Sequence, residues 1–303
     1  MNLFKAKINN WDDWGKVYQS IPDFAPLAEY ILQKENLPAA KLEHLTPGTN
    51  AVFRAGDYVI KMYAPPESGL DQSLDLQSEL FSVRRANALG VLTPRLVAEG
   101  FVEDKYRFAY LIMEYIEGEE FCEAVKKMTE GEKITAGRKL REITDRLNTP
   151  CEAFNGIDAI NNKDRWERWN RYPESFKAER EAYIKTHSFG EKVFVHGDLC
   201  GDNILISPEG EFYIIDFADS LLAPAVYEHA LMVFVFKFDL ALLLGYFGDY
   251  NAAKLVEICF NGLLIHDFGG DIAAERLGEP AEFKCLEDLR KMLREKIDTL
   301  KAM

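Results

Sequence analysis

Three oxygen-bearing side chains follow one another at spacings that suit phosphoryl-transfer chemistry. Asp198 and Asn203 stand in the segment His-Gly-Asp-Leu-Cys-Gly-Asp-Asn, and Asp216 stands in Ile-Ile-Asp-Phe. Short apolar runs at 193–195 and 212–215 predict two small buried strands beside them. One carboxylate can accept a hydroxyl proton, while the amide oxygen and the other carboxylate hold Mg²⁺ against nucleotide phosphates. Because chance rarely places Asp, Asn and Asp behind two such strands, the motif predicts a magnesium-dependent phosphoryl-transfer site.

A second pair of charged residues points to the same chemistry. Lys61 lies near the end of an apolar strand, and Glu79 lies on the apolar stripe of the following helix, between Leu76 and Val83. An unpaired carboxylate on a buried helix face is costly, so a cationic partner is expected. Asp75, one turn earlier on the same helix, is the competing partner for the lysine. We predict that Lys61 pairs with Glu79, since each then neutralises the other.

Strands and helices have to bring these groups together. Hydrophobic periodicity and turn residues predict a sheet-rich first part and a helical second part, divided near Glu117-Gly118. The first part is predicted to contain a helix capped by Asn10, a helix over 25–35, a hairpin of strands 51–55 and 58–63, a helix over 71–89 and a hairpin of strands 96–101 and 108–113. The second part is predicted to contain helices over 134–147, 164–185, 231–247, 251–264 and 281–302, with the two catalytic strands between the second and the third. The predicted domains are residues 1–117, with a helical extension at 1–44, and residues 118–303.

The order of the catalytic groups resembles the catalytic and metal-binding loops of the kinase fold. The His-Gly-Asp opening at His196, where protein kinases carry His-Arg-Asp, is similar to that of the aminoglycoside phosphotransferase and choline kinase superfamily. The resemblance covers residues 45–264 and is sharp only in the two loops. It implies an α+β, bilobal, protein-kinase-like fold. An N-terminal lobe with an antiparallel sheet and one major helix would bind the nucleotide, and a larger, mostly helical C-terminal lobe would carry the catalytic and substrate residues.

The resemblance also implies a role for each residue of the two motifs. Asp198 is the catalytic base, which orients the acceptor hydroxyl more than it deprotonates it early, because the transition state of phosphoryl transfer is loose. Asn203 and Asp216 are the Mg²⁺ ligands. Glu79 orients Lys61 onto the α- and β-phosphates of the nucleotide.

Two further segments are expected to contact the nucleotide. A Pro-Gly-Thr-Asn turn precedes Lys61 at the place where the superfamily has its short phosphate loop, and its backbone N–H groups can face phosphate. The strand that ends in Met-Glu-Tyr-Ile is expected to form the hinge between the lobes and to contact adenine through backbone groups. These additional nucleotide-binding residues are Gly48, Thr49, Asn50, Met113, Glu114 and Ile116.

Several positions differ from those of protein kinases. Cys200 stands where protein kinases carry a lysine, Ala218 replaces the glycine of Asp-Phe-Gly, and Glu228 stands where the superfamily often has an aspartate. Pro224 follows the metal loop so soon that no long activation segment fits, and a protein substrate would dock on that segment. An ordinary imidazole titrates near neutral pH, so His196 is the alternative base, but it ends an apolar strand, and we expect it to brace the loop. A small-molecule kinase is therefore favoured over a protein kinase.

The acceptor site is expected in the helical lobe, opposite the catalytic base. Acidic and aromatic side chains of the kind that bind cations occur together at Asp164, Trp166, Glu167 and Trp169. The two tryptophans are also three residues apart on a predicted helix, and core-facing tryptophans are the commoner explanation. The formal net charge of −14 is compatible with a cationic substrate and argues against a nucleic-acid partner. Solubility explains this charge equally well.

The sequence favours a cytoplasmic protein without a membrane segment. The apolar run at 231–244 is broken by Lys237 and Asp239 and is too short to span a bilayer, and no signal peptide is expected at the N-terminus. The five cysteines are an odd number without Cys-x-x-Cys spacing, which fits a reduced compartment. The oligomeric state is left open.

We therefore expect an ATP- or GTP-dependent kinase that phosphorylates a hydroxyl of a small, polar, cationic molecule, with an aminoglycoside-like sugar as the first expectation. The same fold phosphorylates choline, amino alcohols and sugars, so a metabolite kinase is the alternative and antibiotic resistance does not follow. A nucleotide-binding pseudokinase is a further alternative, which the intact catalytic set disfavours. A hydrolase with Asp198 and Asp216 as acid and base is another, and it has no use for Asn203 or Mg²⁺.

Overall fold

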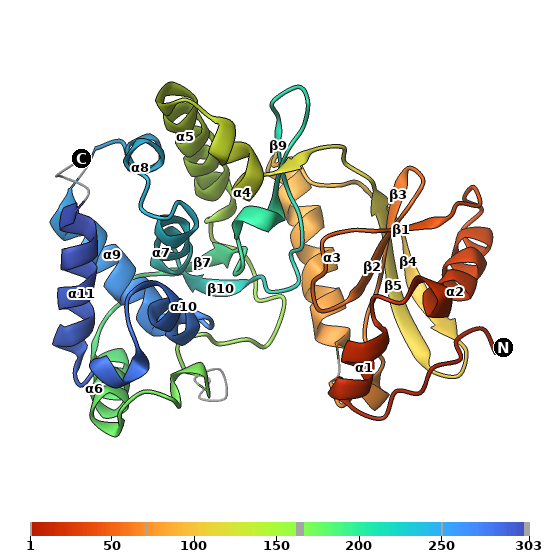
Figure 1. Ribbon diagram of the computed structural model, residues 1–303, viewed down its shortest axis with the longest axis horizontal. Coiled ribbons are helices and arrows are strands. Elements are labelled where there is room, and N and C mark those ends of the chain that lie inside the picture. Colours follow the sequence, from red (N-terminus) through yellow and green to blue (C-terminus); the bar gives the residue numbers. More distant parts are fainter. Residues whose placement is uncertain (1, 71, 162–166, 250, 300–303) are drawn as a thin grey trace.

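The computed structural model describes residues 2–70, 72–161, 167–249 and 251–299. Two lobes lie side by side, and Figure 1 shows the sheet of the first lobe and the helices of the second on either side of one long helix, α3. This arrangement agrees with the predicted α+β, bilobal, kinase-like fold.

A five-stranded antiparallel sheet with the strand order β1-β2-β3-β5-β4 forms the first lobe. Its strands are β1 (Leu42–His44), β2 (Ala51–Ala55), β3 (Tyr58–Met62), β4 (Leu96–Glu103) and β5 (Arg107–Glu114). The turn between β2 and β3 contains Gly56 with a φ of +64°, a conformation that glycine adopts without steric cost. Both predicted hairpins are thus confirmed. The short strand β1 was not predicted, because three residues are too few for an alternating pattern.

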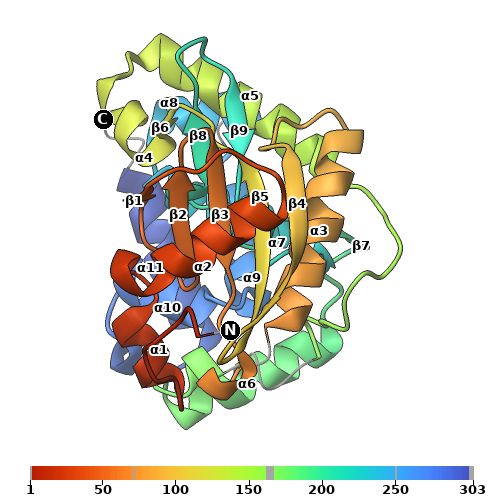
Figure 2. The ribbon, with the colours of Figure 1, turned by 90° about the vertical axis from the view of Figure 1, so that its right-hand side faces the viewer.

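Three helices cover the two faces of this sheet: α1 (Trp11–Val17), α2 (Ile21–Lys34) and α3 (Ser73–Ala88). The outer-face side chains Ile60 and Tyr110 are buried in a core with α1 and α2, and Figure 2 shows α2 lying across that face. Successive strand side chains point to opposite faces, so Lys61 faces inward, opposite Leu111 in the register of β3 and β5. Leu111 packs against Leu76 of α3. The alternation of β3 therefore directs Lys61 towards α3.

The second lobe is mostly helical. Its helices are α4 (Phe121–Ala124), α5 (Glu130–Leu147), α6 (Glu174–Thr186), α7 (Val226–Val235), α8 (Leu240–Phe247), α9 (Ala252–Ile265), α10 (Gly269–Arg276) and α11 (Leu286–Asp298). Short 3-10 helices are η1 (Pro66–Ser68) in the first lobe and η2 (Val125–Lys127), η4 (Gly201–Asn203) and η5 (Pro280–Glu282) in the second. Its short strands are β7 (Lys192–Val195) paired with β10 (Leu221–Pro224), and β6 (Glu119–Glu120), β8 (Ile204–Ile206) and β9 (Phe212–Ile214) in a second small sheet.

One hydrophobic core joins the short strands to the helices of the second lobe. Phe194 of β7 and Ile214 of β9 are fully buried in it, together with Leu140 of α5 and Phe260 of α9. The loops that follow β7 and β9 carry the two sequence motifs. The core therefore holds both loops at fixed positions on a rigid base.

The helix predicted over 164–185 is wrong in its first half. Helix α6 begins at Glu174, after Pro173, and the described residues 167–172 form a short turn and loop. Proline disfavours the helical conformation of the residue before it, which explains why no continuous helix crosses this position. Residues 162–166 lie outside the described part of the chain.

Two other helix predictions are also corrected. The helix predicted over 231–247 is two helices, α7 and α8, because Lys237 and Phe238 adopt positive φ angles of 50° and 62° and break it. The C-terminal helix begins at Leu286 rather than at 281, and α10 precedes it without having been predicted. The predicted lobe boundary at residues 117 and 118 stays a prediction. Among the described residues, no helix combines the length and the apolarity needed to cross a membrane.

The loop between α5 and α6 is anchored to the second lobe through Asp158. Its carboxylate accepts hydrogen bonds from the backbone N–H groups of Ile160 and Asn161 at 3.0 and 3.2 Å and contacts the Lys192 ammonium at 3.1 Å. Burial alone would raise the pKa of Asp158, but the contacts with Asn161 and Lys192 lower it to about 2. The carboxylate therefore stabilises the fold when it is ionised.

Replacing Asp158 by alanine is expected to lower the free energy of unfolding at pH 7 by about 1 kcal/mol, since the pair is partly exposed and screened by solvent. The folded-state pKa lies below the ordinary value, so this stabilisation is present above about pH 4 and is lost as the pH falls towards about 2. Urea unfolding of the wild type and of Asp158→Ala between pH 7 and pH 3 measures the difference. Lys192→Ala, which removes only the ion pair, should cost less. A difference that grew with acidity would contradict this assignment.

Candidate active site

One cleft between the lobes gathers the predicted catalytic and nucleotide-binding residues. It has a volume of about 730 Å³ and is lined by the sheet, the hinge after β5 and the loops of the second lobe. The predicted residues that line it are Gly48, Thr49, Asn50, Lys61, Glu79, Met113, Glu114, Ile116, Asp198, Asn203 and Asp216. The central prediction from the sequence was that two distant motifs converge on one cavity, and in the structure both motifs line this cleft.

Lys61 lies at the centre of a buried network. Its Nζ is 2.7 Å from Oε2 of Glu79 and 2.7 Å from Oδ1 of Asp216. Lys61 and Glu79 are nearly fully buried, and the Tyr63 hydroxyl donates a hydrogen bond to the same Glu79 oxygen. The predicted Lys61–Glu79 ion pair is therefore present, and it joins the sheet to α3 and to the metal loop.

Charge pairing decides the protonation of this network. Burial alone would lower the pKa of Lys61, but the carboxylates of Asp216 and Glu79 hold it above its ordinary value. Burial also raises the pKa of Glu79, against the lowering effect of Lys61 and Tyr63. In Asp216 the lysine outweighs burial and the pKa is lowered. The lysine stays a cation and Asp216 stays a carboxylate at neutral pH, which is the charge state that phosphate and metal binding require.

The catalytic loop holds Asp198 against Asn203. The amide nitrogen of Asn203 donates to the backbone carbonyl of Asp198 at 2.8 Å and lies 3.3 Å from its Oδ2. Burial, followed by the nearby carboxylates of Asp219 and Asp216, raises the pKa of Asp198 to about 7. A carboxylate with a raised pKa is a better proton acceptor than an ordinary aspartate.

His196 braces this loop from below. It is fully buried, its Nε2 is 3.0 Å from the carbonyl oxygen of Ile215, and its Nδ1 accepts a hydrogen bond from the backbone N–H of Asp198 at 3.3 Å. Burial lowers the pKa of His196 to about 4, so the ring is neutral. Glu228 accepts a hydrogen bond from the backbone N–H of His196 at 2.6 Å. Both ring nitrogens are occupied by backbone groups, which supports the structural role expected for this histidine.

Gly197, between His196 and Asp198, has no room for a side chain. Its φ is +88°, and a Cβ atom there would lie 2.1 Å from the carbonyl oxygen of Asp219. Gly197→Ala is expected to lower the free energy of unfolding by about 3 kcal/mol, since it combines a left-handed backbone with a backbone clash. Chemical denaturation measures this loss. Gly15→Ala is the control, because nothing lies within 4 Å of a Cβ at Gly15. Equal stability of the two variants would contradict the geometry.

The donor set suits a magnesium ion. The amide nitrogen of Asn203 donates a hydrogen bond to Asp198, so the amide oxygen is left to bind a cation. Asp216 supplies a carboxylate. Mg²⁺ prefers such oxygen ligands and keeps water and phosphate oxygens in its other positions. The residues at 203 and 216 therefore fit the ion that the sequence motif implied.

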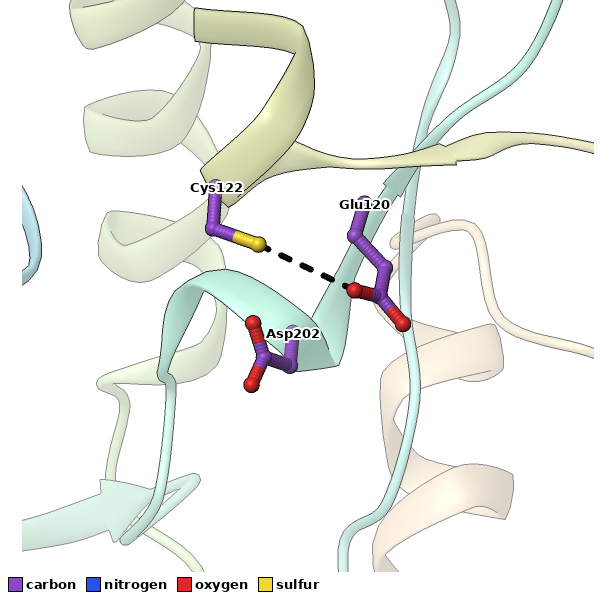
Figure 3. Close-up of side chains that lie close together, drawn as sticks. All are labelled: Glu120, Cys122 and Asp202. Atoms are coloured by element: carbon purple, nitrogen blue, oxygen red, sulfur yellow. Dashed lines mark hydrogen bonds between the residues drawn. The ribbon is translucent and has the colours of Figure 1, made fainter. Parts of the chain in front are cut away.

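A second group of polar side chains, which no sequence pattern predicted, lies at the rim of the cleft. Glu120, Cys122 and Asp202 point towards one another in Figure 3, and their ligand atoms lie within 4.8 Å of one another. Pairing of β6 with β8, which places Glu120 opposite Leu205, brings residues 120 and 202 together. Burial and the Asp202 carboxylate raise the pKa of Cys122 to about 12, so the thiol stays protonated and is not a ready metal ligand.

Of the predicted acceptor-site residues, the structure describes only two. Trp169 is 2% exposed and stacks on Phe176 with ring centroids 5.5 Å apart, so it belongs to the core of the second lobe. Its assignment to the substrate pocket is corrected, and the core-facing alternative holds for this residue. Glu167 is exposed and does not line the cleft described above. Asp164 and Trp166 lie outside the described residues.

Comparisons with known proteins agree with this geometry. The sequence model of the phosphotransferase enzyme family matches residues 48–257. No curated protein matches the sequence. Similar solved structures include a choline/ethanolamine kinase family protein from Mesorhizobium loti, with 19% identity, a TM-score of 0.54 and 90% of each chain covered. Choline kinase LicA from Streptococcus pneumoniae has 16% identity and a TM-score of 0.56, with 91% of this chain and 100% of that chain covered.

An aminoglycoside phosphotransferase has the same fold. The GDP complex of aminoglycoside 2'-phosphotransferase-IIIa has 15% identity and a TM-score of 0.58, with 91% of this chain and 99% of that chain covered. At these identities the likeness establishes the kinase-like fold, and the family match extends over more than half of the sequence. The chain belongs to the phosphotransferase enzyme family, to which its two motifs had pointed.

Proposed function

We propose that this protein transfers the γ-phosphoryl group of ATP or GTP to a hydroxyl of a small, polar, cationic molecule. The observation that carries the proposal is the single cleft into which Lys61, Asp198, Asn203 and Asp216 all project. Phosphoryl transfer depends on positioning and on electrostatic stabilisation more than on covalent chemistry by the protein. Lys61, beside Asp216, would supply the electrostatic stabilisation, and Asp198, beside Asn203, would position the acceptor.

The nucleotide would lie between the sheet and the catalytic loops. Lys61 would exchange its contact with Asp216 for the nucleotide phosphates while Glu79 keeps it oriented. Backbone N–H groups of the loop at 48–50 would face the phosphates, and backbone groups at Glu114 and Ile116 would contact the base. All of these residues line the cleft.

Asp198 would hold the acceptor. Its carboxylate would accept a hydrogen bond from the acceptor hydroxyl and orient the oxygen towards the γ-phosphorus. It would take the proton as the new O–P bond forms and the bond from the γ-phosphorus to the bridging oxygen breaks, which releases the nucleoside diphosphate. Asn203 fixes the loop through its hydrogen bond to the backbone of Asp198. When bound by Asn203 and Asp216, Mg²⁺ neutralises the charge of the phosphates.

Acidic side chains at the mouth of the cleft favour a cationic acceptor. Glu119, Glu120, Glu123 and Asp202 line the same cavity as Asp198. Glu119 and Glu123 are paired with Lys127 and Lys126, so Glu120 and Asp202 are the acidic groups left to attract a cation. A cleft with charges of one sign focuses its potential and concentrates ligands of the opposite sign. An aminoglycoside-like sugar is the first candidate, and choline, an amino alcohol or another sugar is the second. Proteins of similar fold include enzymes named for each class.

Two other functions make different predictions. A pseudokinase would bind nucleotide without turnover, and the complete Lys, Glu, Asp, Asn and Asp set disfavours it. A hydrolase that used Asp198 and Asp216 as acid and base would keep its activity in EDTA. A cytoplasmic location stays a prediction from the cysteine pattern, and all five cysteines are free thiols.

A coupled ADP-release screen tests the proposal. Aminoglycosides, choline-like amines and sugars are each added with Mg-ATP and, separately, with Mg-GTP. We expect acceptor-dependent release of nucleoside diphosphate with at least one cationic class and its loss in EDTA. Nucleotide binding without turnover on any acceptor would favour a pseudokinase, and activity that survives EDTA would favour a hydrolase.

A further inference from the structure

One face of α3 is attached to the second lobe along most of its length. Ser78, Phe81 and Arg85 are spaced by three and four residues, so their side chains lie on the same side of the helix. All three contact residues 149–155, a described segment after α5 that we call the docking segment. This face is adjacent to Glu79, which points at Lys61 instead.

Two contacts hold the C-terminal part of α3. The Arg85 guanidinium donates to the Thr149 hydroxyl at 2.7 Å, to the Thr149 carbonyl at 3.1 Å and to the Pro150 carbonyl at 3.2 Å. Phe81 stacks on Phe154 with ring centroids 4.4 Å apart and an interplanar angle of 7°. Val83 and Ala86 of the same helix are buried with Phe194 in the core of the second lobe. The helix is therefore packed as part of that lobe.

The third contact reaches the catalytic network. The amide nitrogen of Asn155 donates to the Ser78 hydroxyl at 2.9 Å and to the Ser220 carbonyl at 2.8 Å. Ser78 immediately precedes Glu79, and Ser220 lies four residues after Asp216. The amide oxygen of Asn155 accepts a hydrogen bond from the backbone N–H of Ile157 at 3.3 Å, which fixes the orientation of the amide. A single side chain thus joins the helix of Glu79 to the loop of Asp216.

The sheet also contacts α3, and one of these contacts is the ion pair between Arg84 and Glu99 of β4 at 2.9 Å. Leu76 packs with Tyr63 and Leu111 in a small cluster, and the Lys61–Glu79 pair crosses from the sheet to the helix. The contacts of Ser78, Phe81 and Arg85 with the second lobe restrain the rotation of α3 about its axis, which decides where Glu79 points. Helix α7 begins at Val226, ten positions after Asp216, so no long segment that could hold α3 lies between them.

We propose that Asn155 is a positioning residue, which holds α3 in the rotation that aims Glu79 at Lys61 and ties that rotation to the metal loop. The inference rests on the proposed function, since it assigns Asn155 a part in nucleotide turnover. Asn155 does not line the cleft and acts through Glu79.

Asn155→Ala tests the inference in the full-length protein. Turnover of Mg-ATP with water as acceptor is followed by ADP release, and Mg-ATP affinity is measured by titration. We expect kcat/KM to fall about tenfold, because a small misorientation of a catalytic group is costly. In a Glu79→Gln background the same change should lower it less than about twofold, since the two residues act as one unit. An equal loss in both backgrounds would mean a merely structural role and would overturn the proposal.

Matched variants separate positioning from stability. Asn251→Ala removes the side-chain cap of α9, where Asn251 accepts the Lys254 backbone N–H at 3.0 Å, and should lower stability without a kinetic change. Ser78→Ala removes only the hydrogen bond between Asn155 and α3. It should lower kcat/KM as Asn155→Ala does, and should do so only when Glu79 is present. A wild-type rate in both Ser78→Ala and Asn155→Ala would overturn the proposal.

Hydrogen exchange distinguishes this inference from the proposed function. Amides of α3 in Asn155→Ala are expected to exchange about tenfold faster than in the wild type, with those of α9 unchanged. In Asn251→Ala the amides of α9 should exchange faster and those of α3 should be unchanged. If the wild type neither binds nor hydrolyses Mg-ATP, the proposed function and the catalytic part of this inference both fail. Unchanged exchange of α3 would overturn the positioning role even in an active enzyme.

Discussion

Asp198→Asn is expected to lower kcat for phosphoryl transfer by about 1,000-fold, because the acceptor hydroxyl loses both its orienting group and its proton acceptor. The affinity for Mg-nucleotide should change less than about threefold, since the metal ligands and Lys61 are retained. Asparagine has the shape of aspartate, and the bond from Asn203 to the backbone carbonyl at 198 does not depend on the side chain. The loss should therefore appear in kcat rather than in binding.

Stability provides the control for Asp198→Asn. Burial and the carboxylates of Asp219 and Asp216 raise the pKa of Asp198, so its charge is disfavoured in the folded state. Removing that charge should leave the melting temperature equal or higher. Single-turnover kinetics with an acceptor from the screen, beside nucleotide titration and thermal unfolding, give all three quantities. Near-wild-type turnover in a well-folded variant would show that another group is the base.

Asp216→Asn is expected to act on binding itself. It should weaken the affinity for Mg-nucleotide about 100-fold, equivalent to about 2.7 kcal/mol, because a charged metal ligand becomes a neutral one. In EDTA the affinity for free nucleotide should stay close to that of the wild type. Titration with and without Mg²⁺ separates the two effects.

The backbone at position 216 makes this substitution a mild one for the fold. Asp216 has a φ of +58°, in the left-handed region that asparagine adopts more readily than most residues. Lys61 loses one carboxylate and keeps its contact with Glu79 at 2.7 Å. The variant should therefore fold normally, as circular dichroism can check. Equal dependence on Mg²⁺ in variant and wild type would exclude Asp216 as a metal ligand.

The sequence predicted which residues share the cleft because the signals there are local. Asp198, Asn203 and Asp216 stand in two motifs beside short apolar strands, and the strand period directs Lys61 inward whatever the rest of the fold does. The Lys61–Glu79 pair followed from the cost of an unpaired carboxylate on the apolar stripe of a helix. These inferences depend on short-range pattern and on burial, which a single sequence carries.

Short-range patterns could not predict the acceptor site or the group of Glu120, Cys122 and Asp202 at the rim of the cleft. The periodic pattern around Trp169 fitted both a pocket wall and a core helix, and packing against Phe176 decided for the core. Glu120 and Asp202 lie about eighty positions apart and meet only because β6 pairs with β8. Neither segment carries a motif that could have indicated the other.

By itself, the sequence determined which side chains are candidates for binding the phosphates and the metal and for facing the acceptor, and these side chains line one cleft. Such groups are fixed by residue type and by spacing along one strand or loop. Only the tertiary structure decided how α3 is held, because Ser78, Asn155 and Ser220 come from three separate segments whose approach leaves no periodic trace. Contacts of that kind depend on the packing of both lobes, which becomes defined only when the whole chain has folded.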